Sequence, residues 1–260
     1  MKHAFVIPAY GQSPHLGDCL ASLSAQTAST LVVIATSTPS PWLQAQADAA
    51  GLPLHVHGPP SGIAHDWNMA LSAAPQDATW VTIAHQDDLY DPRFVERTLE
   101  TVAAVGDALL AFTDYREVTA AGVRATTPLM AVKRVLLELG FLGRASVRSG
   151  ARKRSLWFGT PIPCPSVTVR RDLGAIFDTS YGVSLDWAAW LDLCDRGGSF
   201  VWVREVLMTH RIHGDSETTQ AIAAGKRMRE DERLLRRLWP GWIARMIVRS
   251  YRFAYASNRT

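Results

Sequence analysis

Two adjacent carboxylates, Asp87 and Asp88, are the residues of this chain whose type and position most clearly suggest chemistry. They follow residues 80–84, an apolar run typical of a buried strand. They precede a predicted helix start, with Asp91 as N-cap and Pro92 as the first helical residue. Ligands of open α/β sheets bind at the carboxyl ends of strands, and Mg²⁺ or Mn²⁺ is commonly shared between carboxylates and substrate phosphates. The pair therefore predicts a site for a metal-chelated nucleotide diphosphate, whereas an isolated Asp-Asp would indicate only a solvated turn.

The elements that would position this pair alternate between strand and helix through the first 115 residues. Apolar residues at helical spacing predict a helix between each pair of short apolar runs. Ser13-Pro14 is the expected cap of the first helix, and Gly51 is the expected end of the second. Strands are expected at residues 4–7, 31–34, 54–57, 80–84 and 108–112. Strands separated by single helices predict a parallel sheet covered on both faces.

The rest of the chain is less regular. Residues 116–158 are basic and turn-rich, and no element is predicted there. Further elements are expected as strands at 166–169 and 200–203, a helix over 184–195, and a helical pattern from 216 to the end that is interrupted at 240–241. We therefore predict one α/β domain over residues 1–215, divided at 115 into a nucleotide-sugar-binding half and an acceptor half, and a basic helical extension over 216–260.

Composition fits a globular protein of 260 residues, with 47% hydrophobic and 20% charged residues. No apolar run reaches the ~18 residues of a membrane span, and no signal peptide is expected at the N-terminus. Three cysteines without Cys-x-x-Cys spacing are interpreted as reduced thiols of a cytoplasmic protein. The net charge of +3 includes +6 in residues 133–154 and +7 in residues 226–260. These segments indicate either an anionic partner, such as an acceptor or the inner face of a membrane, or solvated helix faces.

Several other nucleotide and hydrolase signatures are absent from the sequence. The loop after the first predicted strand is Pro-Ala-Tyr-Gly-Gln and lacks the Gly-x-Gly-x-x-Gly of a dinucleotide-binding fold. Gly225-Lys226 precedes Arg227 in a late helix, so it is not a P-loop. No Gly-x-Ser-x-Gly nucleophile elbow occurs. A nucleotide site in this chain must therefore be built differently from a dinucleotide-binding fold or a P-loop, and no nucleic-acid partner is expected.

Six short motifs in a consistent order resemble the inverting glycosyltransferase family 2 over roughly residues 3–215. They are VIPAY at 6–10, GIAHDWNMA at 62–70, QDD at 86–88, FGTPIPCPSV at 158–167, LDW at 185–187 and HRIH at 210–213. The resemblance implies a GT-A fold, which is a Rossmann-like, mostly parallel central sheet flanked by helices. It also implies transfer of a sugar from a nucleotide diphosphate sugar with the help of Mn²⁺ or Mg²⁺.

The same resemblance implies which residues form the donor and metal sites. Family members commonly carry an Asp at the end of the second strand, and here Ser37 or Thr36 stands in its place. The implied donor-binding residues are Pro8, Tyr10, Ser37, Asn68, Gln86 and Asp87, and the implied metal ligands are Asp88 and His213. Pro8 also fits a structural strand terminator, Asn68 a buried structural amide, and His213 a structural histidine or a contact to the diphosphate.

Asp186 is the predicted general base, because the acceptor hydroxyl must lose a proton as it attacks the anomeric carbon. The family often has Glu-Asp where this chain has Leu185-Asp186. Asp186 lies in the first turn of a predicted helix, where the helix dipole is expected to lower the pKa of its carboxyl group. The alternative interpretation is an acid placed at a helix start for that dipole alone.

The function that the resemblance implies is transfer of a sugar from a UDP- or dTDP-type donor to a hydroxyl of a glycan or lipid-linked acceptor, in surface polysaccharide or lipopolysaccharide synthesis. Two alternatives stay open at this point. Residues 84–88 resemble the Ala-His-Pro-Asp-Asp motif of zinc-dependent sugar deacetylases, although that motif normally follows the first strand. The missing second-strand Asp and the missing Glu also fit a non-catalytic sugar-nucleotide-binding module.

Overall fold

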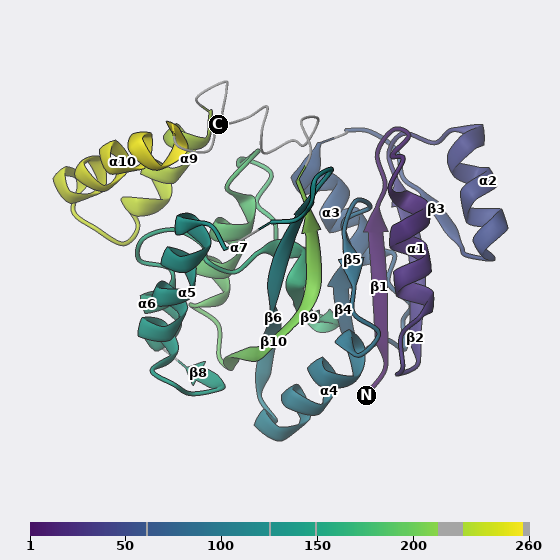
Figure 1. Ribbon diagram of the computed structural model, residues 1–260, viewed down its shortest axis with the longest axis horizontal. Coiled ribbons are helices and arrows are strands. Elements are labelled where there is room, and N and C mark those ends of the chain that lie inside the picture. Colours follow the sequence, from purple (N-terminus) through teal and green to yellow (C-terminus); the bar gives the residue numbers. More distant parts are fainter. Residues whose placement is uncertain (61, 125, 149, 213–225, 257–260) are drawn as a thin grey trace.

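The computed structural model describes residues 1–60, 62–124, 126–148, 150–212 and 226–256. Its N-terminal half is a series of strands and covering helices. Figure 1 shows them around one central sheet. The elements are β1 (His3–Pro8), α1 (Leu16–Ser24), β2 (Thr30–Thr36), α2 (Pro41–Ala50), β3 (Leu54–Val56), α3 (Ile63–Ser72), β4 (Trp80–Ile83), β5 (Leu89–Tyr90), α4 (Phe94–Val105) and β6 (Ala108–Thr119). The alternation predicted for this half is confirmed.

The second half contains more regular structure than the sequence predicted. Its elements are β7 (Gly122–Val123), α5 (Pro128–Phe141), β8 (Ser146–Arg148), α6 (Gly150–Ser155), the 3₁₀ turn η1 (Cys164–Ser166), β9 (Val167–Arg170), the 3₁₀ turn η2 (Arg171–Leu173), α7 (Leu185–Leu193), β10 (Ser199–Arg211), α9 (Lys226–Leu235) and α10 (Gly241–Ala256). Over residues 116–158, where the sequence indicated only a basic and turn-rich stretch, the structure contains β7, α5, β8 and α6. Helix α5 begins with a Thr127 cap and Pro128, but apolar residues also occupy its exposed face, so it lacks a clear amphipathic pattern.

The sheet has the order β3-β2-β1-β4-β9-β6-β10-β5, with β7 and β8 paired to β6 and β10. Strands β1, β2, β3 and β4 are parallel, and β6 is parallel to β10. Strand β9 is antiparallel to both of its neighbours, β4 and β6. The predicted mostly parallel central sheet is confirmed, with β9 as an antiparallel insertion. Because β2 and β4 lie on opposite sides of β1, the chain reverses direction across the sheet there, and ligands of α/β folds bind at such a switch point.

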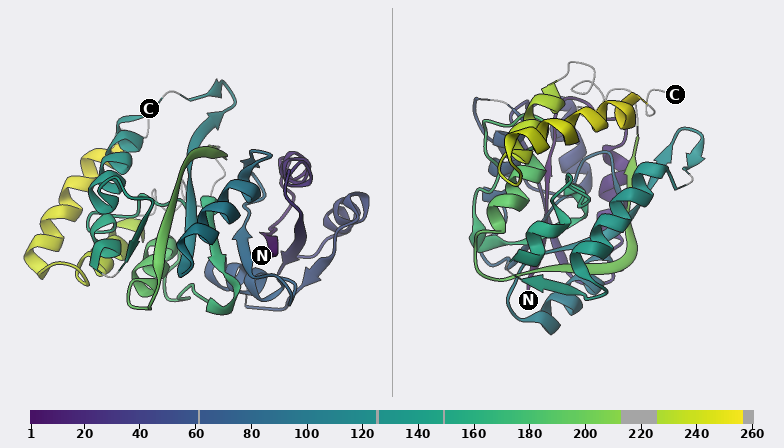
Figure 2. Two further views of the ribbon diagram at one scale, coloured as in Figure 1. Left: turned by 90° about the horizontal axis from the view of Figure 1, so that it is seen from below. Right: turned by 90° about the vertical axis from the view of Figure 1, so that its left-hand side faces the viewer.

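Alternating side chains of β1 point into two cores on opposite faces of the sheet. Phe5 and Ile7 pack with buried residues of α1, α2 and α4. Val6 packs with α3 and α7 in the larger core, which also includes Leu234 of α9 and Ala244 of α10. The C-terminal helices therefore share the main core, and Figure 2 shows them at the opposite end of the molecule from α2. None of the described helices is long and apolar enough to cross a membrane.

Two predicted helix starts were wrong by a few residues. Helix α1 has His15 as its N-cap, and the Ser13 hydroxyl donates instead to Asp87. Helix α4 begins at Phe94 with Arg93 as N-cap, because Asp91 closes a turn by accepting from the Arg93 N–H at 2.9 Å. In both cases the polar side chain is engaged in a loop before the helix.

Because His3 is buried, we expect the free energy of unfolding of the protein to fall in acid. Both ring nitrogens lie within hydrogen-bond distance of threonine hydroxyls, at 2.7 Å and 2.9 Å, and burial lowers the pKa of the ring from 6.5 to about 3. Below pH 6.5 the His3 ring binds a proton in the unfolded chain, whereas in the folded chain it stays unprotonated until the pH approaches 3. Stability is therefore lost as the pH falls from 6.5 towards 3. His3→Gln is expected to flatten this dependence by up to ~1.4 kcal/mol per pH unit. Urea unfolding at pH 6 and pH 4.5 measures the slope, and an unchanged slope in the variant would contradict the assignment.

Candidate active site

The candidate site lies at the switch point, where the loops after β1 and β4 meet. Gln86 joins the two loops, because its side-chain oxygen accepts from the Tyr10 N–H at 3.2 Å and its amide donates to the Tyr10 carbonyl at 3.1 Å. The Gly11 N–H donates to the Thr38 hydroxyl at 3.2 Å and so joins the loop after β2 to the same group. The structure thus brings the predicted donor residues from three parallel strands to one edge of the sheet. Gln86 holds the loops together through backbone contacts.

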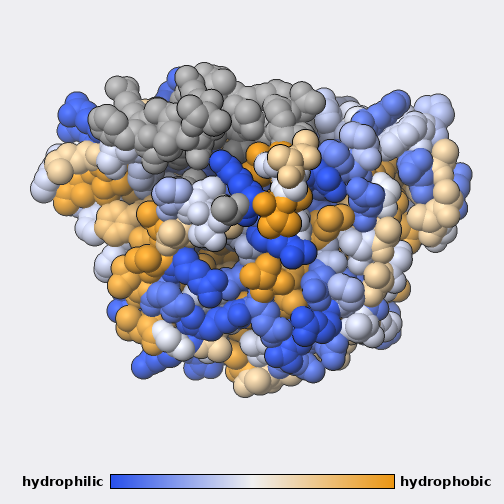
Figure 3. Space-filling model, in the orientation of Figure 1, coloured by the Kyte–Doolittle hydropathy of each residue, from blue (hydrophilic) through white to orange (hydrophobic). Residues whose placement is uncertain are grey.

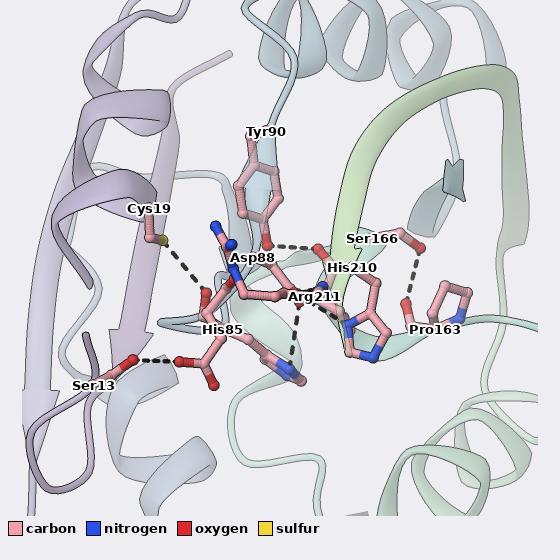
Figure 4. Close-up of polar contacts among 11 residues, drawn as sticks. Ser13, Cys19, His85, Asp88, Tyr90, Pro163, Ser166, His210 and Arg211 are labelled. Atoms are coloured by element: carbon pink, nitrogen blue, oxygen red, sulfur yellow. Dashed lines mark hydrogen bonds and ion pairs between the residues drawn. The ribbon is translucent and has the colours of Figure 1, made fainter. Parts of the chain in front are cut away.

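Asp88 is the most constrained acid of the site (Figure 4). Its side chain is 1% exposed, and Oδ1 accepts from His210 Nδ1 and from the Arg211 N–H, both at 2.9 Å. Burial alone would raise the pKa of Asp88, but the charge and hydrogen bond of His210 outweigh it, and the pKa is lowered. Burial also opposes protonation of His210, yet the charge of Asp88 raises the pKa of that ring. Asp88 is therefore held as a buried carboxylate.

The second oxygen of Asp88 fits a divalent cation. Oδ2 is buried and has no hydrogen-bond partner, and His85 Nδ1 lies 3.9 Å from it. Burial lowers the pKa of the His85 ring, although the neighbouring charge of Asp88 opposes this effect. Among the described residues, no three His, Cys, Asp or Glu side chains form a metal-binding group by themselves. A cation at Asp88 would thus take further ligands from substrate phosphates or water, as Mg²⁺ usually does.

The Asp87 carboxylate contacts the loop after β1, whereas the Asp88 carboxylate contacts β10. The Asp87 carboxylate accepts from the Ser13 hydroxyl, and the Asp87 backbone carbonyl accepts from Arg211 Nε at 3.0 Å. The Arg211 guanidinium also pairs with Asp18 at 3.2 Å. Arg211 therefore connects the end of β10 to the Asp-Asp loop and to α1.

The nucleoside end of the predicted site contains unsatisfied polar groups. Tyr10 is 59% exposed, whereas Pro8 is half-buried as the last residue of β1. Buried Ser37 Oγ, both ring nitrogens of His57 and Asp66 Oδ1 lack hydrogen-bond partners, and His57 Nε2 lies 3.9 Å from Asp66 Oδ1. Ser37 and His57 lie together because the His57 N–H donates to the Thr36 carbonyl at 3.0 Å. Buried polar atoms of this kind cost free energy unless a ligand or water satisfies them.

Asn68 holds a loop of the acceptor half. Its side-chain oxygen accepts from the N–H groups of Ile176 and Phe177 at 3.1 Å and 3.0 Å, and its amide donates to the Phe177 carbonyl at 2.7 Å. These contacts fit the alternative interpretation of Asn68 as a structural amide. A direct contact of Asn68 with the donor stays a prediction.

Asp186 lies at the start of α7, and its carboxyl pKa is raised rather than lowered. Burial is the largest cause, and it outweighs the nearby charges of Arg227 and Lys133 and the Trp187 N–H bond. The expectation of a lowered pKa from the helix dipole was therefore wrong, because burial is set by tertiary packing that the local sequence does not show. Burial and the charges of both Asp186 and Asp88 raise the pKa of the Cys164 thiol.

Three residues of the site were not identified from the sequence as functional. His85 and Asp66 lie within two of the stretches singled out in the sequence, 84–88 and 62–70, but neither residue was given a role there. His57 lies at the end of the strand expected over 54–57 and outside every motif. His210 was noticed beside His213, but His213 was chosen as the metal ligand. His213 lies outside the described residues, so its role stays a prediction.

Comparison with solved structures shows the same fold in several glycosyltransferases at low sequence identity. TarS residues 1–349 of S. aureus in complex with UDP-GlcNAc has a TM-score of 0.60 at 14% identity, over 95% of this chain and 70% of that one. Mannosyltransferase PcManGT of Pyrobaculum calidifontis in complex with GDP-Man and Mn²⁺ has a TM-score of 0.60 at 16% identity, over 89% of this chain and 61% of that one. Glucosyl-3-phosphoglycerate synthase of Mycobacterium tuberculosis in complex with phosphoglyceric acid has a TM-score of 0.63 at 15% identity, over 91% of this chain and 80% of that one. The chain spans 42% of the longer TarS structure.

The fold and the site define a GT-A glycosyltransferase. The chain belongs to glycosyl transferase family 2, whose family model matches residues 4–173. Membership decides against the zinc deacetylase alternative, as does the position of the Asp-Asp pair after β4 instead of the first strand. A search of the curated proteins finds no significant match.

Proposed function

We propose that this chain is a metal-dependent inverting glycosyltransferase that uses a UDP- or dTDP-sugar and a hydroxyl acceptor of a glycan or lipid-linked precursor. The observation that carries the proposal is the buried carboxylate oxygen of Asp88, which lacks a partner at the switch point of the sheet. Structural neighbours in complex with UDP-GlcNAc, and with GDP-Man and Mn²⁺, support the donor class and the metal. A role in surface polysaccharide or lipopolysaccharide synthesis, in the cytoplasm, is part of the same proposal.

The proposed chemistry assigns separate tasks to the two acids. Asp88 would hold Mn²⁺ or Mg²⁺, and the bound ion would neutralise the diphosphate that leaves with the nucleotide. Asp186 accepts the proton of the acceptor hydroxyl as that oxygen attacks the anomeric carbon and the bond to the diphosphate breaks. The raised pKa of Asp186 suits this task, because it makes the carboxylate a stronger base than an exposed aspartate.

The unsatisfied groups beside β2 and β3 support a pyrimidine base. Asp66 Oδ2 accepts from the Gly62 N–H at 3.4 Å, so Oδ1 is the acceptor that remains. The hydroxyl of Ser37 and a ring N–H of His57 supply donors. Uracil and thymine present one N–H between two carbonyls, which matches one acceptor and two donors. Guanine presents two neighbouring N–H donors, which one carboxylate oxygen does not match as well.

Asp66→Ala is expected to weaken UDP binding by about tenfold or more, because it removes a charged acceptor from a buried site. Calorimetric titration of UDP, dTDP and GDP in the presence of Mn²⁺ measures the effect. Asp48→Ala on the exposed side of α2 is the control and should bind like the wild type. Tighter binding of GDP than UDP by the wild type would reject the pyrimidine assignment.

The membrane contact that we propose uses exposed apolar residues of α5 and α10. Val132, Val135 and Leu139 follow one face of α5, and Trp242 and Met246 follow one face of α10. Figure 3 shows hydrophobic surface over this side of the molecule. The neighbouring exposed arginines are Arg134, Arg245 and Arg249. Apolar side chains flanked by cations suit the interface of an anionic membrane.

Trp242→Ser combined with Met246→Ser is expected to reduce binding to vesicles that contain phosphatidylglycerol, because both side chains would insert among the lipids. Vesicle flotation measures the bound fraction, and Leu31→Ser, at an exposed apolar position of β2, is the control. Equal flotation of the variant and the wild type would reject this surface. A change from dimer to monomer without vesicles would assign the surface to a second copy of the chain.

A further inference from the structure

Helix α9 supplies a carboxylate that caps α7 from a distant part of the chain. Glu230 Oε1 accepts from the Gly182 N–H, and Oε2 accepts from the N–H groups of Val183 and Ser184, all at 2.9 Å. Glu230 is 9% exposed, so these bonds are largely shielded from water. One carboxylate thus fixes three successive peptide groups immediately before the helix that carries Asp186.

The neighbouring acid of α9 strengthens the same junction. The Ser184 hydroxyl donates to Asp231 Oδ1 at 2.7 Å, and Asp231 is 2% exposed. Ser184 is the N-cap residue of α7, but its side chain makes no cap bond to the helix backbone. A Ser at this position ordinarily accepts from the helix N–H groups itself. Here the N-cap side chain is turned to α9, so contacts with α9 fix the entry of the chain into α7.

Close packing and charge also connect α9 to the general base. An added side chain at Gly182 would meet the Lys226 amine, so this turn and the first residue of α9 are in close approach. Arg227 lowers the pKa of Asp186, whereas Asp231 raises it. The charged residues of α9 therefore face the turn and the first residues of α7, while the family model ends at residue 173.

We propose that Glu230 is a positioning residue for sugar transfer, through which α9 holds the first turn of α7 so that the Asp186 carboxylate faces the acceptor hydroxyl. This inference rests on the proposed function. It makes α9 a part of the catalytic unit, even though it lies in the predicted extension over 216–260. A carboxylate is suited to the task because bonds to a charged acceptor are shorter and stronger than neutral ones.

The test compares Glu230→Ala and Glu230→Asp with Glu232→Gln, a variant of the same helix whose carboxylate pairs with Arg236 near the surface. Release of UDP from UDP-glucose and UDP-N-acetylglucosamine, with water as the acceptor, measures turnover. We expect kcat to fall at least about tenfold in Glu230→Ala, with an unchanged KM for the donor. Partial recovery is expected in Glu230→Asp, and no change in Glu232→Gln.

A double-mutant cycle with Asp186→Asn distinguishes positioning from a general loss of folding. If Glu230 acts through Asp186, Glu230→Ala has little further effect on the residual turnover of Asp186→Asn. An equal fold-loss in both backgrounds would overturn the inference. Wild-type turnover in Glu230→Ala, with Asp186→Asn inactive, would also overturn it while leaving the proposed function intact. Wild-type turnover in Asp186→Asn would instead reject the proposed base.

Hydrogen exchange gives a second readout that does not depend on turnover. Amides of residues 182–187 are expected to exchange faster in Glu230→Ala than in the wild type, while those of α3 and β4 stay unchanged. Ser184→Ala removes only the hydroxyl bond to Asp231 and should show the same change at smaller size. Unchanged exchange over 182–187 in Glu230→Ala would overturn the positioning role.

Discussion

Asp186→Asn is expected to lower sugar transfer by about 10²- to 10⁴-fold while leaving donor binding unchanged. Asparagine keeps the size of the side chain but cannot accept the proton that the attacking hydroxyl must lose. The carboxylate is buried at the start of α7, and burial raises its pKa, so the wild-type group is a stronger base than an exposed aspartate. Initial rates of UDP release and calorimetric binding of UDP measure the two quantities separately.

Asp192→Asn is the matched control for this substitution. Asp192 lies on the same helix, and its half-exposed carboxylate pairs with Arg237 at 2.6 Å. We expect this control to transfer sugar like the wild type. If Asp186→Asn retained wild-type transfer, a different group would have to accept the proton. If it lost donor binding as well, Asp186 would belong to the donor site.

Asp88→Asn is expected to reduce transfer by at least about 10²- to 10³-fold and to abolish the dependence of nucleotide binding on metal. The substitution keeps the shape but removes the charge of a carboxylate that is 1% exposed and lies beside His210. Without that charge, a divalent ion at this site would lose the carboxylate oxygen that we propose as its ligand.

Asp91→Asn is the control for the second substitution, because asparagine also accepts from a backbone N–H two residues later. It preserves the turn before α4 and should leave transfer unchanged. Calorimetric titration of UDP with Mn²⁺ and with EDTA distinguishes the variants. Metal-dependent binding that survived in Asp88→Asn would place the cation elsewhere.

The features that were predicted correctly are those encoded by neighbouring residues. The apolar run before Asp87-Asp88 indicated a strand end, and the structure places both acids at the switch point of the sheet. The partner of Asp88, His210, is 122 residues away in the chain. No local pattern can indicate such a contact, because it depends on how β10 lies beside β6 and β5.

The failed expectations share a dependence on tertiary packing. The pKa of Asp186 was inferred from a helix start alone, whereas the largest effect is burial by distant residues. Helix α5 was missed because its exposed face carries Val135 and Leu139, so polar and apolar residues do not separate clearly. Ser13 was expected to cap α1, but its hydroxyl donates to Asp87 from the fourth βα unit. To predict each of these features, one would have to know where another part of the chain lies in the fold.

The most direct test of the account is thermal unfolding of the wild type and Asp88→Asn with UDP, in the presence of Mn²⁺ or EDTA. A ligand that binds only the folded state contributes about 2.7 kcal/mol at a hundredfold excess over Kd, which is expected to raise Tm by roughly 5 °C or more in a chain of this size. The account predicts this rise for the wild type with Mn²⁺, and none with EDTA or in Asp88→Asn. An equal rise in all three conditions, or none with any nucleotide diphosphate, would contradict a metal-dependent donor site at Asp88.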